Sequence, residues 1–220
     1  MGAGLSDIVE LAKALPSMED RRPGWLRALA RVAGDPPYYR LLHEIGLRFR
    51  PRRVLEIGTY EGVSAAHLAA DPGTLVVTVD VVPAATEKAR AIGLQNVRAI
   101  AHDSVSLGAK ISRGEFPIAV PFDLLFVDGE SNFNQAYGEY MAFRPLMAPG
   151  GVVLFDDIRL PMETREMDVF WDYVVDPKAE LPGMHKTGFG ACEVDPVRRL
   201  PPWEEVIGRA SARWLGKEAT

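Results

Sequence analysis

Hydrophobic positions in this chain follow two periods, one typical of buried strands and the other of helices. From position 53 onward, short apolar runs rich in valine, leucine and phenylalanine are each followed by a stretch of helical composition. Such alternation indicates a parallel sheet covered by helices on both faces. The sequence therefore predicts five parallel strands, at Val54–Ile57, Leu75–Asp80, Val97–Ile100, Phe122–Asp128 and Val152–Phe155.

Helical spacing of apolar residues predicts the segments before and between these strands. Three helices are expected ahead of the first strand, and glycine or proline closes most of the predicted helices. They cover Leu5–Leu15 with Ser6 as its cap, Trp25–Val32, Tyr38–Phe49, Gly62–Ala70, Pro83–Ile92, a segment opening at Asp103-Ser104, and Asn134–Met147.

The last quarter of the chain departs from this alternation. Met167–Val175 predicts a helix. Two short strands are expected at Met184–Thr187 and Gly190–Val194, meeting around Gly188-Phe189-Gly190. Trp203–Trp214 predicts a final amphipathic helix, which docks either on the body of the protein or on a second subunit.

Length and composition narrow the class of protein. The 220 residues suffice for one α/β domain, and a hydrophobic fraction of 47% with 25% charged residues is typical of soluble globular proteins. A net charge of −5 gives no electrostatic footprint for nucleic acid. No apolar run approaches the ~20 residues of a membrane-spanning helix, and the single Cys192 does not require an oxidising compartment. We therefore expect a cytoplasmic protein that binds neither nucleic acid nor membranes.

A glycine-bracketed turn joins the first predicted strand to its helix. Gly58 and Gly62 permit a tight turn and the close approach of a ligand, and the following helix points free N–H groups into that turn. The pattern Glu-x-Gly-x-x-x-Gly differs from the Gly-x-Gly-x-x-Gly of dinucleotide-binding loops. The carboxylate of Glu56 suits a ligand with an amino group, such as an amino acid or a nucleoside linked to one.

The run Leu55-Glu56-x-Gly58-x-Tyr60-x-Gly62-x-Ser64-Ala65 resembles the first motif of class I S-adenosylmethionine (SAM)-dependent methyltransferases, closest to the catechol O-methyltransferase-like branch. The resemblance implies a Rossmann-like α/β fold, with a mostly parallel seven-stranded sheet, helices on both faces and the terminal hairpin at its edge. Residues 1–50 would form an N-terminal helical cap on the SAM-binding domain, residues 51–220. In that cap, Tyr38, Tyr39 and His43 either face the substrate or pack the helices onto the sheet.

Several residues are expected to bind SAM. Asp80 ends the second strand, where a carboxylate can accept hydrogen bonds from ribose hydroxyls, unless it is simply a solvated strand end. The resemblance assigns Asp103 to the adenine amine, although an aspartate there also suits a helix N-cap. Tyr60 and Ser64 match residues that contact the methionine end of the cofactor. The expected cofactor-binding set is Glu56, Gly58, Tyr60, Gly62, Ser64, Asp80, Asp103 and Asp128.

Three further carboxylates follow adjacent strands. Asp128 ends the fourth strand, and Asp156 and Asp157 follow the fifth. Clustered carboxylates repel one another unless protons or a cation offset them, and oxygen ligands select a hard divalent ion such as Mg²⁺. The resemblance implies the same, because the matching positions of catechol-type enzymes are Asp, Asp and Asn and hold the metal. We predict these three aspartates as metal ligands and catalytic residues, with a role in cofactor binding and structure as the alternative.

The implied reaction is transfer of the SAM methyl group to a hydroxyl oxygen of a small molecule, assisted by the metal. Catechol-type enzymes carry a lysine base three positions after the first metal aspartate, where this chain has Ser131. Either the metal alone lowers the pKa of the hydroxyl, or Glu130, His43 or His185 accepts the proton.

Other readings of the sequence stay open. One is a metal-independent methyltransferase acting on nitrogen or oxygen, and another is a SAM-binding protein that transfers no methyl group. A homodimer is a further possibility, suggested by the aromatic residues Trp203 and Trp214.

Overall fold

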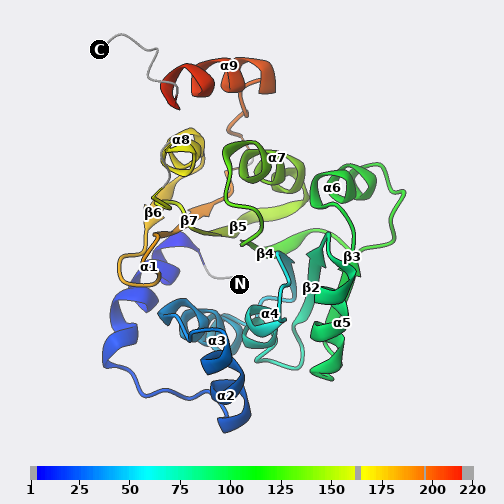
Figure 1. Cartoon of the computed structure of the whole chain (residues 1–220), viewed down its shortest axis with the longest axis vertical. Coiled ribbons are helices and arrows are strands. Elements are labelled where there is room, and N and C mark those ends of the chain that lie inside the picture. The colour runs from blue at the N-terminus through cyan, green and yellow to red at the C-terminus, as the bar shows by residue number, and fades with distance from the viewer. Residues whose placement is uncertain (1–3, 162–164, 196, 215–220) are drawn as a thin grey trace.

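A twisted sheet of seven strands forms the middle of the computed structural model, with helices on both faces (Figure 1). The structure describes residues 4–161, 165–195 and 197–214. The strand order is β3-β2-β1-β4-β5-β7-β6, in which β1 to β5 are parallel and β7 and β6 antiparallel to their neighbours. The predicted mostly parallel seven-stranded sheet is therefore confirmed.

The strands agree closely with the five that the sequence predicts for the parallel part of the sheet. Each predicted run is found, although β5 begins at Met147, ahead of the predicted Val152. The bounds are β1 Arg53–Ile57, β2 Leu75–Asp80, β3 Val97–Ala101, β4 Phe122–Val127, β5 Met147–Asp156, β6 Lys178–Glu180 and β7 Phe189–Glu193.

The helices form two layers, with α1 to α4 on one face of the sheet and α6 to α8 on the other (Figure 1). Single 3₁₀ turns at Leu15–Ser17 and Arg144–Leu146 extend α1 and α7. The bounds are α1 Leu5–Ala14, α2 Gly24–Val32, α3 Pro37–Phe49, α4 Val63–Leu68, α5 Pro83–Ala91, α6 Ser104–Ser112, α7 Phe133–Phe143, α8 Glu166–Tyr173 and α9 Trp203–Trp214.

Successive residues of the central strands enter different cores. Leu55 and Leu125 pack with α6, α7 and α8, whereas Val54 and Leu124 pack with the helices of the N-terminal segment. Because side chains alternate along a strand, a strand covered on both faces must be apolar at nearly every position. This explains the continuous apolar runs, and it makes α1 and α3 part of the same packed body as the sheet.

Two predictions near the ends of the chain are wrong. Helix α1 starts after Gly4 and not at a Ser6 cap, because the side chain of Asp7 accepts the Gly4 N–H at 3.1 Å. The strand predicted at Met184–Thr187 is absent, and β7 pairs instead with β6 at Lys178–Glu180. Gly183, with φ of +79°, turns the chain before Met184, so residues 181–188 form a connection whose side chains serve the site described below.

Every helix in the described ranges is too short or too polar to cross a membrane. The domain boundary near residue 50, the cytoplasmic location and the homodimer stay predictions. Residues 162–164 of the loop after β5 and the side chain of Trp214 lie outside the described parts of the chain.

Candidate active site

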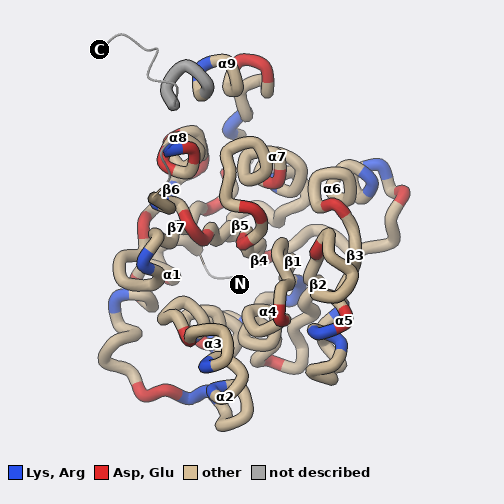
Figure 2. The backbone as a smooth tube through the Cα atoms, in the orientation of Figure 1, with Lys and Arg blue, Asp and Glu red and all other residues tan. Residues whose placement is uncertain are grey.

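Two adjoining cavities lie at the carboxyl ends of the parallel strands. The larger has a volume of about 660 Å³ and the smaller about 400 Å³, and Gly58, Tyr60 and Asp128 line both. Figure 2 shows acidic segments near the ends of β1, β4 and β5, in the middle of the view. In open parallel sheets ligands bind beyond this edge. Two ligands, or two parts of one ligand, can therefore meet at the shared wall.

Gly58 brings two strand ends into backbone contact. Its φ is +92°, and a Cβ at this position would lie 1.9 Å from the carbonyl oxygen of Asp128. No other residue type fits there. Gly62, with φ of +73°, lines neither of the two cavities, and its missing side chain would meet Ala89 and Ile92. Packing against α5 therefore accounts for glycine at position 62, and its predicted cofactor contact stays a prediction.

Asp80 orders the glycine loop. Its Oδ2 accepts the N–H groups of Thr59 at 2.9 Å and Tyr60 at 3.1 Å, and its Oδ1 accepts the Val82 N–H at 2.8 Å. The carboxylate also lines the smaller cavity. Since a carboxylate oxygen accepts about two hydrogen bonds, one acceptor site remains, on Oδ1, for a ribose hydroxyl.

Glu56 is fully buried and lines neither cavity. Its Oε2 accepts a hydrogen bond from Thr78 Oγ1 at 2.5 Å, whereas its Oε1 has no partner among the described residues. Burial raises the pKa of Glu56 to about 7, although hydrogen bonds from Ser64 and Thr78 oppose this. Because Glu56 lines neither cavity, its predicted contact with an amino group stays a prediction.

Asp103, Tyr60 and Ser64 line the cavities, and their predicted contacts with the cofactor stay predictions. Asp103 caps α6, because its Oδ1 accepts the Ser106 N–H at 2.7 Å, and it also lines the smaller cavity, so its two predicted roles can coexist. Tyr60 is 71% exposed, beside both cavities, and Ser64 is buried at the wall of the larger one.

A compact polar cluster occupies the larger cavity. Ligand atoms of Asp156, Asp157 and His185 lie within 4.8 Å of one another. His185 Nδ1 is 2.7 Å from Asp156 Oδ1 and 3.6 Å from Asp157 Oδ1. Asp157 is further held by Ser131 Oγ, which donates to Oδ2 at 2.8 Å, and by the hydroxyl of Thr187, which donates to Oδ1. Two of the three predicted metal ligands, Asp156 and Asp157, thus meet a histidine from the β6–β7 connection.

Asp128 adds a third carboxylate to this cluster, which we call the aspartate cluster (Asp128, Asp156, Asp157 and His185). Burial and the nearby charge of Asp156 raise the pKa of Asp128 well above its usual range. Burial also raises the pKa of Asp156, against the effect of its hydrogen bond with His185. That same hydrogen bond raises the pKa of His185. The aspartate cluster therefore holds more negative charge than one imidazole offsets.

This donor set fits a hard divalent cation. Carboxylate oxygens from two strand ends, with one imidazole nitrogen beside them, suit magnesium or manganese. A cation would offset the burial and the neighbouring charges that raise the pKa values of Asp128 and Asp156. Sequence reasoning includes His185 only as a candidate proton acceptor and misses Thr187 as a partner of Asp157. The available signal is the pair of polar residues, His185 and Thr187, within a segment otherwise typical of a strand.

The N-terminal helices contribute the outer wall of the larger cavity. Tyr38 and Tyr39 line it, together with the segment 33–37 and Lys186. The Tyr38 hydroxyl is 3.5 Å from Asp128 Oδ2. His43, by contrast, is buried away from both cavities, and neither of its ring nitrogens has a hydrogen-bond partner among the described residues.

Comparison with known proteins matches part of the chain. Residues 55–158 match the model of a family described as a methyltransferase domain. A catechol O-methyltransferase of Mycobacterium tuberculosis is 33% identical over 132 residues, which make up 59% of this chain and 59% of that relative. The matched region thus spans about three fifths of the relative's length.

Solved structures share the fold over most of the chain. An O-methyltransferase from Bacillus cereus, in complex with S-adenosylhomocysteine (SAH), has a TM-score of 0.65 at 18% identity, covering 87% of this chain and 100% of its own. The methyltransferase MycE of the mycinamycin biosynthetic pathway, in complex with Mg and SAH, has a TM-score of 0.54 at 18% identity, covering 90% of this chain and 65% of its own.

Proposed function

We propose that this chain carries a class I SAM-dependent methyltransferase domain and transfers the methyl group of SAM to a hydroxyl oxygen of a small molecule. The activity of the catechol O-methyltransferase relative supports this proposal. The net charge of −5 favours a small-molecule acceptor over a nucleic acid.

The shared wall of the two cavities is the observation that carries the proposal. The smaller cavity offers Asp80 and Asp103 as acceptors for a nucleoside, and the larger contains the aspartate cluster. A cofactor that crosses the shared wall at Gly58 would present its methyl group to an acceptor beside that cluster. Holding two reactants in line accounts for roughly 7–11 kcal/mol of a reaction barrier, and a sulfonium methyl needs little further activation.

The proposal includes a divalent metal held by Asp128, Asp156 and Asp157, with His185 beside them. Bound there, the metal would orient the acceptor and lower the pKa of its hydroxyl. The mutual repulsion of the carboxylates supports this part, as does the Mg bound by MycE, which shares the fold. The chain's own contribution is to orient Asp157, through Ser131 and Thr187, and to shield the site with Tyr38 and Tyr39.

One observation favours a second candidate, a methyltransferase that needs no metal. His185 Nδ1 lies 2.7 Å from Asp156, and such a histidine–carboxylate pair can accept a hydroxyl proton. Since Ser131 replaces the lysine of catechol-type relatives, His185 is the candidate base that lies in the larger cavity.

Calorimetric titration of the full chain tests both candidates. We expect SAH to bind without metal, and catechol, used as a probe acceptor, to bind only when SAH and Mg²⁺ are present. Asp156→Asn should abolish catechol binding and leave SAH binding within about threefold, because a charge is removed from the larger cavity alone. Glu87→Gln, an exposed position on α5, is the matched control and should change neither.

The possible results separate the proposals. Catechol binding that is independent of Mg²⁺ would support the metal-free candidate. Failure of the wild-type chain to bind SAH would overturn the proposed function itself.

A further inference from the structure

Three side chains of the smaller cavity form a closed hydrogen-bond network. Glu139 is 1% exposed, and its Oε1 accepts hydrogen bonds from Ser104 Oγ at 2.7 Å and Gln135 Nε2 at 2.7 Å. Gln135 Nε2 also donates to Ser104 Oγ at 2.9 Å. Gln135 and Glu139 lie one turn apart on α7, and Ser104 begins α6 on the other side of the cavity.

The network fixes which way the amide of Gln135 points. Ser104 has one hydroxyl proton and donates it to Glu139, so towards Gln135 it can only accept. Gln135 Nε2 then donates towards both oxygens, which lie on the same side of the amide. The carbonyl oxygen Oε1 must take the opposite side of the amide, and it accepts no hydrogen bond from any residue that the structure describes.

The backbone at position 129 lies close to this network, so a side chain there would crowd Glu139. Gly129 follows Asp128 at the shared wall, and a Cβ at position 129 would lie 3.3 Å from Glu139 Oε1 and 3.6 Å from its Oε2. Asp103, the residue assigned to the adenine amine from the sequence, uses its Oδ1 to cap α6. On the facing helix α7, Glu139 Oε2 also lacks a hydrogen-bond partner among the described residues, but it is buried. The free acceptor on α7 that a ligand in the cavity can reach is Gln135 Oε1.

We infer that Gln135 is a specificity-determining residue that accepts a hydrogen bond from the 6-amino group of the cofactor's adenine, and that Glu139 is a positioning residue that holds the amide in this orientation. The inference rests on the proposed function, because it concerns the purine end of the same cofactor. A purine with oxygen at position 6 would place one acceptor against another, and the site would reject it.

Binding of two nucleosides tests the inference. The probes are SAH and S-inosylhomocysteine, in which oxygen replaces the 6-amino group, each titrated calorimetrically into the full chain. We expect the wild type to prefer SAH by about 10–100-fold. SAH makes one hydrogen bond to Gln135 Oε1, whereas S-inosylhomocysteine leaves that acceptor unpaired. Gln135→Met, which is close in size and lacks both polar atoms, should weaken SAH by about tenfold and bring the preference below about threefold.

The positioning role of Glu139 has its own variant. In Glu139→Gln, the new amide can donate to Gln135 Oε1 and turn the Nε2 of Gln135 toward the base. We expect S-inosylhomocysteine to bind more tightly than it binds the wild type, and the preference for SAH to fall below about threefold. Gln95→Met, at an exposed glutamine outside both cavities, is the matched control and should leave the preference unchanged.

The ratio of the two affinities separates specificity from folding, since a damaged fold weakens both ligands alike. If Gln135→Met and a second variant, Gln135→Ala, keep the wild-type ratio, the inference is overturned while the proposed function stands. If only Glu139→Gln keeps the ratio, the positioning role of Glu139 is overturned. A wild-type chain that binds neither nucleoside contradicts the proposed function instead.

Discussion

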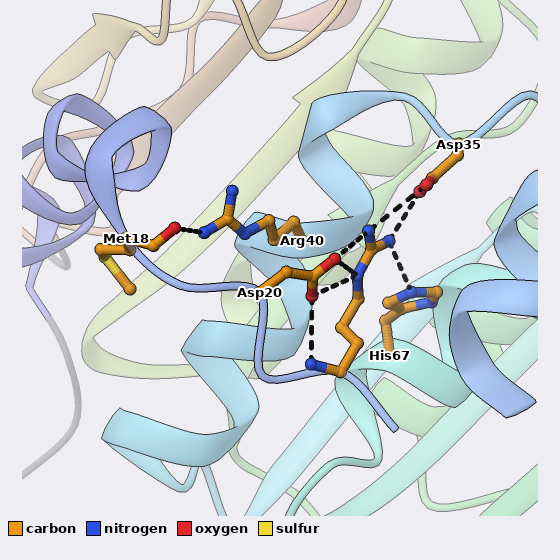
Figure 3. A network of polar contacts seen from close by, with 6 residues as sticks. Met18, Asp20, Asp35, Arg40 and His67 are labelled. Carbon is orange, nitrogen blue, oxygen red and sulfur yellow. Dashed lines mark hydrogen bonds and ion pairs between the residues drawn. The ribbon is translucent and has the colours of Figure 1, made fainter. Parts of the chain in front are cut away.

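Two polar groups near the larger cavity differ in how their carboxylates are paired with cations. Around Arg22, the guanidinium group is 2.8 Å from Asp20 and 2.6 Å from Asp35, and it approaches His67 at 3.4 Å. Figure 3 shows the side chains of Asp20, Asp35 and His67 around this guanidinium group, and we call the set Asp20, Arg22, Asp35 and His67 the arginine network. In the aspartate cluster, by contrast, three carboxylates share one imidazole.

The pKa shifts show the physical consequence of this difference. Hydrogen bonds from Arg22 lower the pKa of Asp20 to about 2, whereas burial and the charge of Asp156 raise that of Asp128 well above its usual range. A buried charge with a matching partner holds the fold in place, and an unmatched set marks a site that awaits a proton, a cation or a ligand. We therefore expect substitutions in the arginine network to change stability, and substitutions in the aspartate cluster to change ligand binding.

Of the substitutions considered, removal of a carboxylate from the aspartate cluster should have the largest effect. We expect it to weaken the binding of Mg²⁺. We expect Asp156→Ala to reduce the affinity for Mg²⁺ by more than the roughly 10–100-fold that loss of an outer-shell partner causes. Thermal unfolding should stay unchanged or shift upward, because repulsion is relieved. Magnesium titration and a melting curve check both parts, with Glu87→Ala as the control. Unchanged Mg²⁺ affinity would remove Asp156 from the metal site.

Removing the cation of the arginine network should instead affect stability. Arg22→Met leaves Asp20 and Asp35 without their partner, and we expect the free energy of unfolding to fall by about 2–3 kcal/mol. This lies at the low end for a broken buried ion pair, since both aspartates are partly exposed. Urea unfolding measures the change. Arg113→Met, which breaks an exposed pair with Glu115, is the control, and an equal loss there would contradict the comparison.

His67, in the arginine network, should make the free energy of unfolding depend on pH. Burial lowers the pKa of His67 to about 4, so near pH 5 the unfolded chain binds a proton there that the folded chain does not. Stability is then lost as the pH falls from about 6.5 towards 4. Between pH 7 and pH 5, the free energy of unfolding of the wild type should fall relative to His67→Gln by about 1–2 kcal/mol.

The difference in free energy of unfolding between the wild type and His67→Gln excludes the effects of other titrating groups. Glu56, whose pKa burial raises to about 7, keeps its proton in the folded chain and stabilises it as the pH falls through that range. This contribution is common to the wild type and His67→Gln. Parallel stability curves for the two proteins would show that His67 titrates alike in the folded and unfolded chains.

The smallest effect is expected at Ser131, which orients Asp157. Ser131→Ala removes one hydrogen bond to a carboxylate, and the affinity for Mg²⁺ should fall by about three- to tenfold. The same titration used for Asp156→Ala measures it. A loss as large as that of Asp156→Ala would mean that Ser131 contacts the metal directly.

The parallel core could be predicted because its signal is local and redundant. Leu75–Asp80 is found with the predicted bounds, since its four inner positions are all buried. Strand β6, Lys178–Glu180, is a three-residue edge strand and carries no such pattern. Met184–Thr187 has the composition of a strand, yet His185 and Thr187 bind the carboxylates of the site instead of pairing in the sheet.

The residues of the candidate site likewise divide into those that could be predicted from the sequence and those that could not. Asp80, Asp128 and Asp156 follow strands, so the topology alone brings them to one edge of the sheet. The placement of Gln135 and His185 depends on how α7 and the β6–β7 connection pack, which no local pattern encodes. Gly62 shows the reverse case, because its position in the motif suggests a ligand while its surroundings are those of helix packing.

The backbone contact between Gly58 and Asp128 limits how far the two halves of the site can move relative to one another. The glycine loop and the end of β4 touch through main-chain atoms, without an intervening side chain that could change rotamer. Both segments are anchored in neighbouring strands of the sheet, so their spacing has the stiffness of the hydrogen-bonded ladder. A misplacement of about 1 Å can slow a reaction about 100-fold. For the proposed reaction, the sheet would therefore set the distance between methyl donor and acceptor, and the side chains around the cavities would decide which molecules bind.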